Sequence, residues 1–193
     1  IRIYFRYICV QNRSMYTEYQ PSHLLVPYID SYWEFKGNPD YGMRIHILPD
    51  GCTDFIFTLG EVANAVEEGS LIMQPYRSYF VGPMTKYSEL VTYTESIHMF
   101  GVRFLPCGLS CFTNLPLHEF VNSRVSTNEM KAVFDDTFIE KLGEQKHVTD
   151  RIRVVEEYLL AYLARHYQPA DSHVAMAVNM INHSKGKRSV RSL

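Results

Sequence analysis

Hydrophobic and polar residues alternate along much of the first half of the chain, most clearly in residues 43–60. Residues 43–47 read Met-Arg-Ile-His-Ile, a two-residue period typical of a strand with one buried face. Residues 53–59 place two phenylalanines and a leucine on one face in the same way. Between these runs, residues 49–51 read Pro-Asp-Gly, which suits a tight turn because proline fixes φ and glycine accepts a positive φ. The pattern predicts two strands joined as a hairpin.

Alternating segments of the same kind recur up to residue 105, each ended by glycine, proline or a cluster of polar residues. The segments between them are too short for the helices that connect parallel strands. This spacing favours a small β-barrel or sandwich over βαβ units. The further strands expected cover residues 31–36, 70–74, 78–81, 88–94 and 98–105.

After Pro106 the hydrophobic period changes to that of amphipathic helices. The helix over 150–167 carries the broadest apolar stripe, and Thr149 or Asp150 is expected to cap it. The sequence therefore predicts the α+β class, with a small β-barrel followed by a helical segment. The helices expected cover residues 108–115, 116–122, 127–143, 150–167 and 171–186.

The two ends of the chain differ from its middle. Residues 1–14 hold three arginines and no acidic residue and precede Met15, so they suggest either an extension upstream of a natural start or an N-terminal strand over 1–10. Near the other end, Ser189 suits the N-cap of a helix whose body would lie past Leu193, as in a piece of a longer protein. The expected divisions are residues 1–14, the barrel over 15–106, a helical linker over 107–168 and the start of another domain over 169–193.

Composition narrows the class of protein. The chain has 46% hydrophobic and 21% charged residues, which is ordinary for a globular domain, and it has no apolar run of the length that a membrane helix needs. Arg2 and Arg6 interrupt the apolar N-terminal segment, which argues against a secretion signal. Four scattered cysteines are too few for a disulfide framework. We therefore expect a cytoplasmic protein with reduced thiols and no membrane partner.

The net charge of −2 is unevenly spread along the chain. Four of the 19 basic residues and no acidic residue lie in 184–193, which leaves 15 basic against 21 acidic residues, a charge of −6, in residues 1–183. An acidic surface of this kind is a poor partner for nucleic acid. Basic character begins only at residues 184–193.

Several segments of this chain resemble the N-terminal sensor region of one branch of the AraC-type transcriptional regulators. They occur in the order found in that family and cover most of residues 15–193. The most specific are Leu-Pro-Asp-Gly-Cys-x-Asp and Gly-Val-Arg-Phe-x-Pro. The tail over 177–193 is similar to the opening of the family's DNA-binding domain. Besides this tail, the matching segments are residues 28–33, 48–57, 81–85, 101–108 and 117–122, and the two most specific motifs lie in the second and the fourth.

The resemblance implies a cupin-like β-barrel that senses a small-molecule effector, a helical linker that often forms a homodimer, and two helix-turn-helix units that bind DNA. Both recognition helices are missing from this sequence, so we expect no DNA-binding residue within it. The sequence also has Cys107 at a position where the family tends to have a small, glycine-like residue. No cofactor and no catalytic residue are expected. The alternatives are a cupin-type metalloenzyme and a stand-alone barrel that binds a small molecule.

Five residues are the expected ligand-binding residues: Trp33, His46, Asp50, Asp54 and Arg103. Arg103 lies between apolar neighbours on a strand, so a buried guanidinium there must be paired, either with the two aspartates or with an anionic ligand. The pairing with the aspartates is the simpler expectation. Aromatic residues Tyr32, Phe55 and Phe57 suit either a pocket or an ordinary core.

Metal and thiol chemistry have weaker support in the sequence. His46, Asp50, Cys52 and Asp54 are close in sequence and His98 lies on a later strand, but no pair of histidines has the spacing of a catalytic metal site. A turn held by Asp50, with Cys52 packed as a small apolar residue, explains the segment without a metal and is preferred. Likewise, Cys107 and Cys111 are expected to be two unrelated reduced thiols rather than a redox switch or half of a zinc site. The apolar stripe over 150–167 suits a dimer interface or packing on the barrel.

Overall fold

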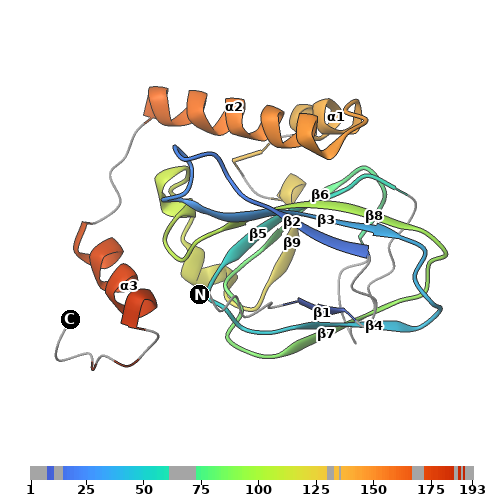
Figure 1. Ribbon diagram of the computed structural model, residues 1–193, viewed down its shortest axis with the longest axis horizontal. Coiled ribbons are helices and arrows are strands. Elements are labelled where there is room, and N and C mark those ends of the chain that lie inside the picture. Colours follow the sequence, from blue (N-terminus) through green and yellow to red (C-terminus); the bar gives the residue numbers. More distant parts are fainter. Residues whose placement is uncertain are drawn as a thin grey trace.

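The computed structural model describes residues 8–10, 15–60, 73–129, 133–134, 136–166, 172–184, 187 and 189. These residues form three layers: two helices, a six-stranded antiparallel sheet beneath them, and a three-stranded antiparallel sheet on the far side (Figure 1). The expected α+β class is confirmed, because antiparallel sheet dominates and few helices accompany it. Among the described residues, no helix is both long enough and apolar enough to cross a membrane.

The chain passes several times from one sheet to the other. The three-stranded sheet has the order β1 (Ile8–Val10), β4 (Met43–Ile47) and β7 (Ser88–Thr92). The six-stranded sheet has the order β2-β3-β8-β5-β6-β9. Its strands are β2 (Tyr16–Tyr19), β3 (Ile29–Gly37), β8 (Ile97–Phe104), β5 (Thr53–Thr58), β6 (Ser78–Val81) and β9 (Arg124–Ser126).

The hairpin expected over residues 43–60 is wrong, although both of its strands exist. β4 pairs with β1 and β7, whereas β5 pairs with β6 and β8 in the other sheet. The turn at residues 49–51 therefore carries the chain from one sheet to the other. Its chemistry is as expected, since Gly51 has a φ of +72°. Local turn residues specify a change of direction, but they do not specify which strand becomes the partner.

The six-stranded sheet is buried on both faces, and the alternation of β5 shows how. Phe55 and Phe57 are fully buried in the main core together with Phe134 and Phe138, on the side of the helices. Ile56 and Asp54 point to the opposite side, toward the smaller sheet. The face division expected from the sequence is thus confirmed. The core holds most of the large apolar side chains, so the helices and this sheet form one hydrophobic unit.

The helical layer consists of α1 (Asp136–Gly143) and α2 (Val148–His166), which lie across the sheet (Figure 1). The apolar stripe of α2 packs on the chain's own sheet, with Val155 and Leu159 fully buried. Polar bonds anchor it as well: Glu156 accepts hydrogen bonds from the Ser22 backbone at 2.7 Å and from the Tyr32 hydroxyl at 3.3 Å. Of the two expected readings of this stripe, intramolecular packing is the one that the structure shows.

Several helix boundaries differ from those expected. Thr149 and Asp150 do not cap α2, because the helix begins at Val148 and both lie in its first turn. The described part of residues 127–143 contains a short 3-10 turn η4 (Thr127–Glu129) and the eight-residue helix α1. The other short helices are η2 (Leu109–Cys111) and η3 (Leu117–Phe120), and the last helix is α3 (Ser172–Ser184).

The ends of the expected divisions also need adjustment. β9 pairs with β6, so the sheet extends past the expected barrel end at residue 106. A three-residue strand is too short to show a period in the sequence. β1 lies within the strand expected over 1–10. The expected strand over 70–74, the Gly186 cap and the helix after Ser189 lie mostly or wholly outside the described residues.

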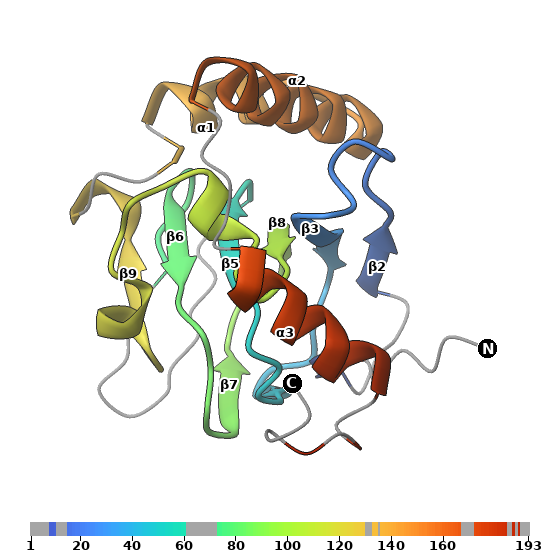
Figure 2. The ribbon, with the colours of Figure 1, turned by 90° about the vertical axis from the view of Figure 1, so that its left-hand side faces the viewer.

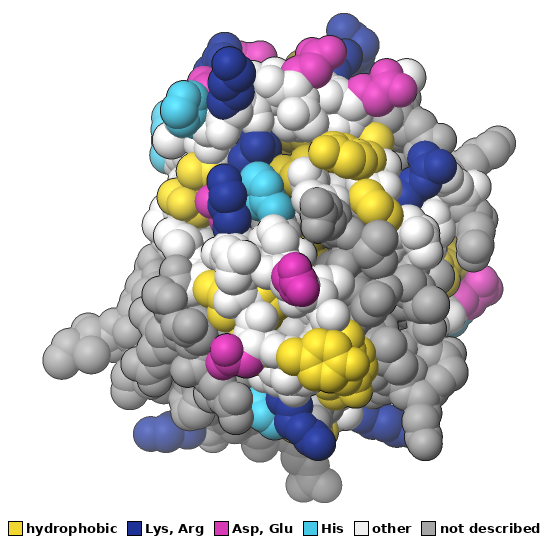
Figure 3. All heavy atoms as spheres, turned by 90° about the vertical axis from the view of Figure 1, so that its right-hand side faces the viewer, with side chains coloured by type: hydrophobic (Ala, Val, Ile, Leu, Met, Phe, Trp, Pro, Cys, Tyr) yellow, Lys and Arg dark blue, Asp and Glu magenta, His cyan; other side chains and the backbone are white. Residues whose placement is uncertain are grey.

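The outward surface of the helical layer is charged. Arg153 of α2 pairs with Asp150 at 3.4 Å and with Glu157 at 3.7 Å, and all three side chains are exposed. Figure 3 shows basic and acidic side chains along the helical edge, with exposed apolar side chains in separate small groups below it. α3 does not join the α1–α2 layer (Figure 2). The apolar face of α2 is therefore covered and its opposite face is solvated.

A polar cluster between α2 and the six-stranded sheet contains a histidine. Glu34 Oε1 lies 2.9 Å from His98 Nε2 and accepts a hydrogen bond from Arg151 Nη1 at 3.3 Å. Burial lowers the pKa of His98, the charges of Arg151 and Lys36 lower it further, and the hydrogen bond to Glu34 opposes them. The unfolded chain therefore binds this proton more readily than the folded protein.

We expect the stability that a neutral His98 provides to be present above its unfolded pKa of about 6.5 and to be lost as pH falls through the lower folded-state pKa. The measurement is the free energy of unfolding of the wild type and of His98→Gln at several pH values across this range. Glutamine can still donate to Glu34 but does not titrate. The wild type should lose more stability on acidification than the variant, and equal losses would refute this role for His98.

Candidate functional site

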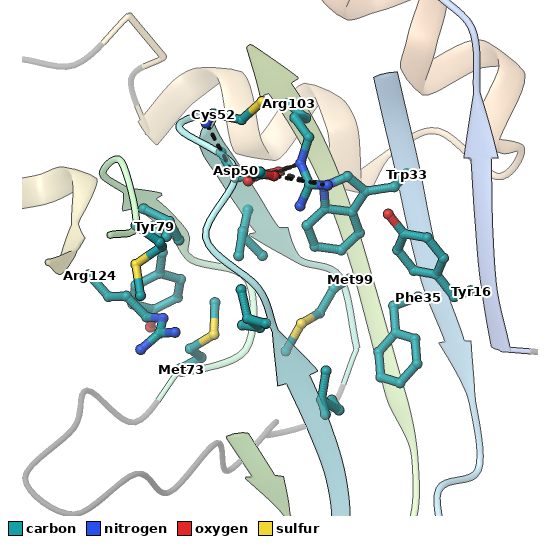
Figure 4. Close-up of a pocket in the computed structure, with 16 residues that line it drawn as sticks. Tyr16, Trp33, Phe35, Asp50, Cys52, Met73, Tyr79, Met99, Arg103 and Arg124 are labelled. Atoms are coloured by element: carbon teal, nitrogen blue, oxygen red, sulfur yellow. Dashed lines mark hydrogen bonds and ion pairs between the residues drawn. The ribbon is translucent and has the colours of Figure 1, made fainter. Parts of the chain in front are cut away.

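A cavity of about 80 Å³ lies between the two sheets and is partly open to the surface. Side chains from both sheets line it, and most of them are apolar (Figure 4). Its polar groups gather mainly at one end, where Trp33, Asp50 and Arg103 lie together. The complete lining is Tyr16, Trp33, Phe35, Ile45, Ile47, Asp50, Cys52, Asp54, Ile56, Met73, Tyr79, Val81, Met84, Met99, Arg103 and Arg124.

Arg103 is the centre of the polar end and is 4% exposed. It lies directly opposite Asp54 on the neighbouring strand, and its Nε is 3.2 Å from both carboxylate oxygens. The indole Nε1 of Trp33 donates to Asp54 Oδ1 at 2.8 Å. Burial opposes the charge on Arg103, but the carboxylates, Asp54 first, outweigh it and raise the pKa of the guanidinium. Arg103 is therefore charged at every pH at which the protein is folded.

Asp50 reaches the same cluster from the turn between β4 and β5. Its Oδ1 accepts the backbone N–H of Cys52 at 2.9 Å, which holds the turn, and its Oδ2 lies 3.7 Å from Arg103 Nη1. Burial raises the pKa of Asp50, and the charge of Arg103 acts against this effect. The expected turn function of Asp50 is confirmed, and so is its pairing with Arg103.

Trp33 is held in place by a glycine on the next strand. Trp33 and Gly101 are directly paired across β3 and β8. A Cβ added at Gly101 would lie 1.9 Å from Trp33 Cε2, so the ring lies flat over a position where no side chain fits. This close approach lets the indole reach Asp54 and makes it one wall of the cavity.

The structure brings together four of the five expected residues, namely Trp33, Asp50, Asp54 and Arg103. His46 does not line the cavity. It lies on the other face of β4 from Ile45 and Ile47, and its ring contacts the Tyr87 hydroxyl. The aromatic residues were expected to line a pocket or to form an ordinary core, and both occur. Trp33 faces the cavity. Tyr32, Phe55 and Phe57 are in the core under the helices.

Sequence reasoning missed most of the apolar lining. Tyr16, Phe35, Met99 and Tyr79 all face the cavity. The alternation contained a signal for two of them, because Phe35 and Met99 are two and four residues from Trp33 and Arg103 on the same strands. Tyr16 and Tyr79 could not be assigned in this way, since their strands are short. Arg124 was also missed, and its Nη2 donates to Ser88 Oγ at 2.8 Å.

Metal and thiol sites find no support in the described part of the chain. No group of three or more His, Cys, Asp and Glu side chains there is arranged to hold a metal ion. Burial, aided by the charge of Asp50, raises the pKa of Cys52, which suits its packing as a small apolar residue. Cys107 and Cys111 are reduced, and Cys111 lies in the core. Cys107 has a φ of +66°, the left-handed conformation that explains why this position favours glycine.

Comparison with protein families gives one result, which bears on the region around the cavity. Residues 17–126 match the family described as "Domain of unknown function (DUF6597)", and this range is more than half of the 193 residues. The chain belongs to the DUF6597 family. A comparison with curated proteins finds no match.

The DUF6597 domain contains nearly all of the cavity. Its range runs from β2 to the end of β9 and includes every lining residue except Tyr16. The helices α1, α2 and α3 lie outside it. The cavity with its polar end thus lies in the part of this chain that matches the family, rather than in the helical segment that follows.

Proposed function

We propose that this chain is the effector-sensing module of an AraC-type transcriptional regulator and that its effector binds in the cavity between the sheets. One observation carries the proposal. The segments that resemble the AraC-type sensor region, although far apart in sequence, meet around this cavity. Trp33 comes from the first segment, Asp50 and Asp54 from the second, and Arg103 from the fourth.

The other two segments support the same cavity wall. Val81 and Met84 of the third segment line the cavity. The fifth segment packs against the third: Asn122 Oδ1 accepts the Thr85 backbone N–H at 2.8 Å, and a Cβ on Gly82 would lie 1.9 Å from the Phe120 carbonyl oxygen. A set of motifs that meets around one cavity is what a binding role requires.

We also propose that the two sheets form a cupin-like jelly roll. The chain passes repeatedly from one sheet to the other, from β3 to β4, from β4 to β5 and from β6 to β7 to β8. Passage of this kind is typical of double-sheet jelly rolls, which enclose their contents between the sheets. The mainly apolar lining with a few convergent polar groups is typical of small-molecule sites.

In this proposal the helices transmit the binding event to a DNA-binding domain that follows, in a homodimer that works in the cytoplasm. Ligand binding would shift the population between two arrangements of the module. The dimer would use a surface other than the apolar stripe of α2, because that stripe is covered by the chain's own sheet. The regulator part is tested by the coding sequence after codon 193: two helix-turn-helix units are expected, and a stop codon there would contradict it.

Binding in the cavity is tested by thermal-shift screening with a library of small metabolites. A ligand at about a hundredfold excess over its Kd stabilises the folded protein by about 2.7 kcal/mol. For a chain of this length that corresponds to a rise in Tm of roughly 5–10 °C. Hits should come from molecules with an apolar body and one polar end.

A pair of variants shows where the hits bind. Ile47→Trp places a bulky ring in the cavity from β4, whereas Leu48→Trp adds the same ring at the next, exposed position outside it. We expect the Tm response to each hit to disappear in Ile47→Trp and to persist in Leu48→Trp. An equal response in both variants would place the binding elsewhere and would contradict the proposal.

A further inference from the structure

Arg103 has hydrogen-bond donors that the protein does not use. Its Nε binds Asp54, but neither Nη1 nor Nη2 makes a hydrogen bond with any described residue. The 3.7 Å from Nη1 to Asp50 Oδ2 is longer than a hydrogen bond. Neither nitrogen is among the described side-chain atoms that are fully buried without a partner, so both keep some exposed surface, and Arg103 lines the cavity. A nearly buried guanidinium thus offers free donors at the polar end.

Asp50 has an unused acceptor at the same place. Its Oδ1 is occupied by the Cys52 backbone N–H, and its Oδ2 has only the long approach to Arg103. Both side chains line the cavity. One donor and one acceptor therefore lie within reach of a single small polar group (Figure 4).

We infer, on the basis of the proposed function, that the ligand is neutral at this end and presents one hydrogen-bond acceptor beside one donor, as a carboxamide or a lactam does. Its carbonyl oxygen accepts from an Nη group of Arg103, and its N–H donates to Asp50 Oδ2. Buried polar groups need partners, so a ligand that matches both groups at once is strongly preferred over one that matches a single group.

The charges at this end disfavour the two ionic alternatives. A carboxylate ligand would accept from Arg103 but would place its second oxygen against Asp50. A protonated amidine or amine would donate to Asp50 but would face the Arg103 guanidinium. Each ion would leave one protein group unmatched beside a guanidinium that is only 4% exposed.

The rest of the cavity fits an apolar, ring-shaped body. Tyr16, Trp33 and Phe35 form one wall, on β2 and β3, and Met73 and Met99 lie farther along the cavity (Figure 4). Methionine side chains are unbranched and adapt to the shape of a ligand. Because the cavity is partly open, a ring can fill it without being wholly enclosed.

The test uses three ligands of the same shape that differ only in this pattern. Benzamide has one acceptor and one donor, benzoate has two acceptors and a negative charge, and benzamidine has two donors and a positive charge. Toluene serves as the apolar reference. Dissociation constants are measured by ligand-observed NMR with the whole 193-residue protein. We expect benzamide to bind at least about tenfold more tightly than each of the other three.

Asp50→Asn should invert the preference. Asparagine keeps an oxygen for the Cys52 N–H and turns the acceptor that faces the cavity into a donor. Benzoate should then gain at least about tenfold in affinity relative to benzamide. The matched control is Asp30→Asn, which removes the same charge near Arg103 but does not line the cavity. Its ratio of the two affinities should stay close to that of the wild type.

The outcomes separate this inference from the proposed function. Tighter binding of benzoate or benzamidine than of benzamide, or equal binding of all four, would overturn the neutral donor–acceptor pattern and leave the cavity as the effector site. An equal change of the ratio in Asp50→Asn and Asp30→Asn would overturn it as well. If neither these four molecules nor any member of the metabolite library binds, both the inference and the proposed function fail.

Discussion

Arg103→Met is expected to reduce the free energy of unfolding by about 3–5 kcal/mol, because it leaves a buried carboxylate without its partner. Asp54 would lose both contacts to Nε at 3.2 Å, and Asp50 would lose the neighbouring positive charge. Methionine has a similar length and fills the space, so the loss reports on charge rather than on packing. The measurement is chemical denaturation of the variant and the wild type under identical conditions.

The double variant Asp54→Leu with Arg103→Met serves as the control for that interpretation. Replacement of a whole buried ion pair by apolar residues is often much less harmful than removal of one partner. The double variant should therefore be more stable than the sum of the two single losses predicts, even though Trp33 Nε1 then lacks its acceptor. Losses that add to within about 0.5 kcal/mol would show that the two side chains act independently.

Gly101→Ala is expected to cost about 3 kcal/mol, because the new methyl group cannot coexist with the present position of Trp33. Its Cβ would lie 1.9 Å from Trp33 Cε2 and 2.4 Å from Nε1, so the whole indole must move. That movement breaks the hydrogen bond to Asp54 and adds the cost of overpacking. Urea denaturation measures the loss, and fluorescence of the single tryptophan reports the displacement of the ring.

Gly143→Ala is the matched control, since it makes the same chemical change in open space. Nothing lies within 4 Å of a Cβ at Gly143, which is the last residue of α1. Alanine favours the helix over glycine, so this variant should gain about 0.5 kcal/mol. If Gly101→Ala costs no more than a few tenths of a kcal/mol, Trp33 is not held by this close approach and the geometry of the polar end is not as described.

Periodicity predicted the individual strands well but not how they are assembled. Residues 43–47 and 53–58 are strands as expected, because alternation is a local property of the sequence. Their assignment to different sheets depends on contacts with β7 and β8, which are distant in sequence. The apolar stripe of α2 was likewise clear from the sequence. Its partner, the chain's own sheet, was one of two options that no local pattern could separate.

The polar end of the site was predicted by the cost of burying charge. An arginine between apolar residues on a strand requires carboxylates, and Asp50 and Asp54 were the nearest candidates on a neighbouring element. His46 shows the limit of this reasoning, since it lies on the same segment but faces away from the cavity. The unused donors of Arg103 could not have been predicted. Whether each donor is used depends on differences of a few tenths of an ångström in the distances between three side chains.

The most direct test of a binding cavity between the sheets uses the one indole N–H of this protein. Trp33 is the only tryptophan, and its Nε1 hydrogen bond to Asp54 is part of the polar end. In a ¹H–¹⁵N correlation spectrum it gives a single indole signal. Titration with benzamide should shift this signal in a saturable manner. An indole signal that stays fixed while benzamide or any screening hit binds the protein would show that the cavity is not the binding site.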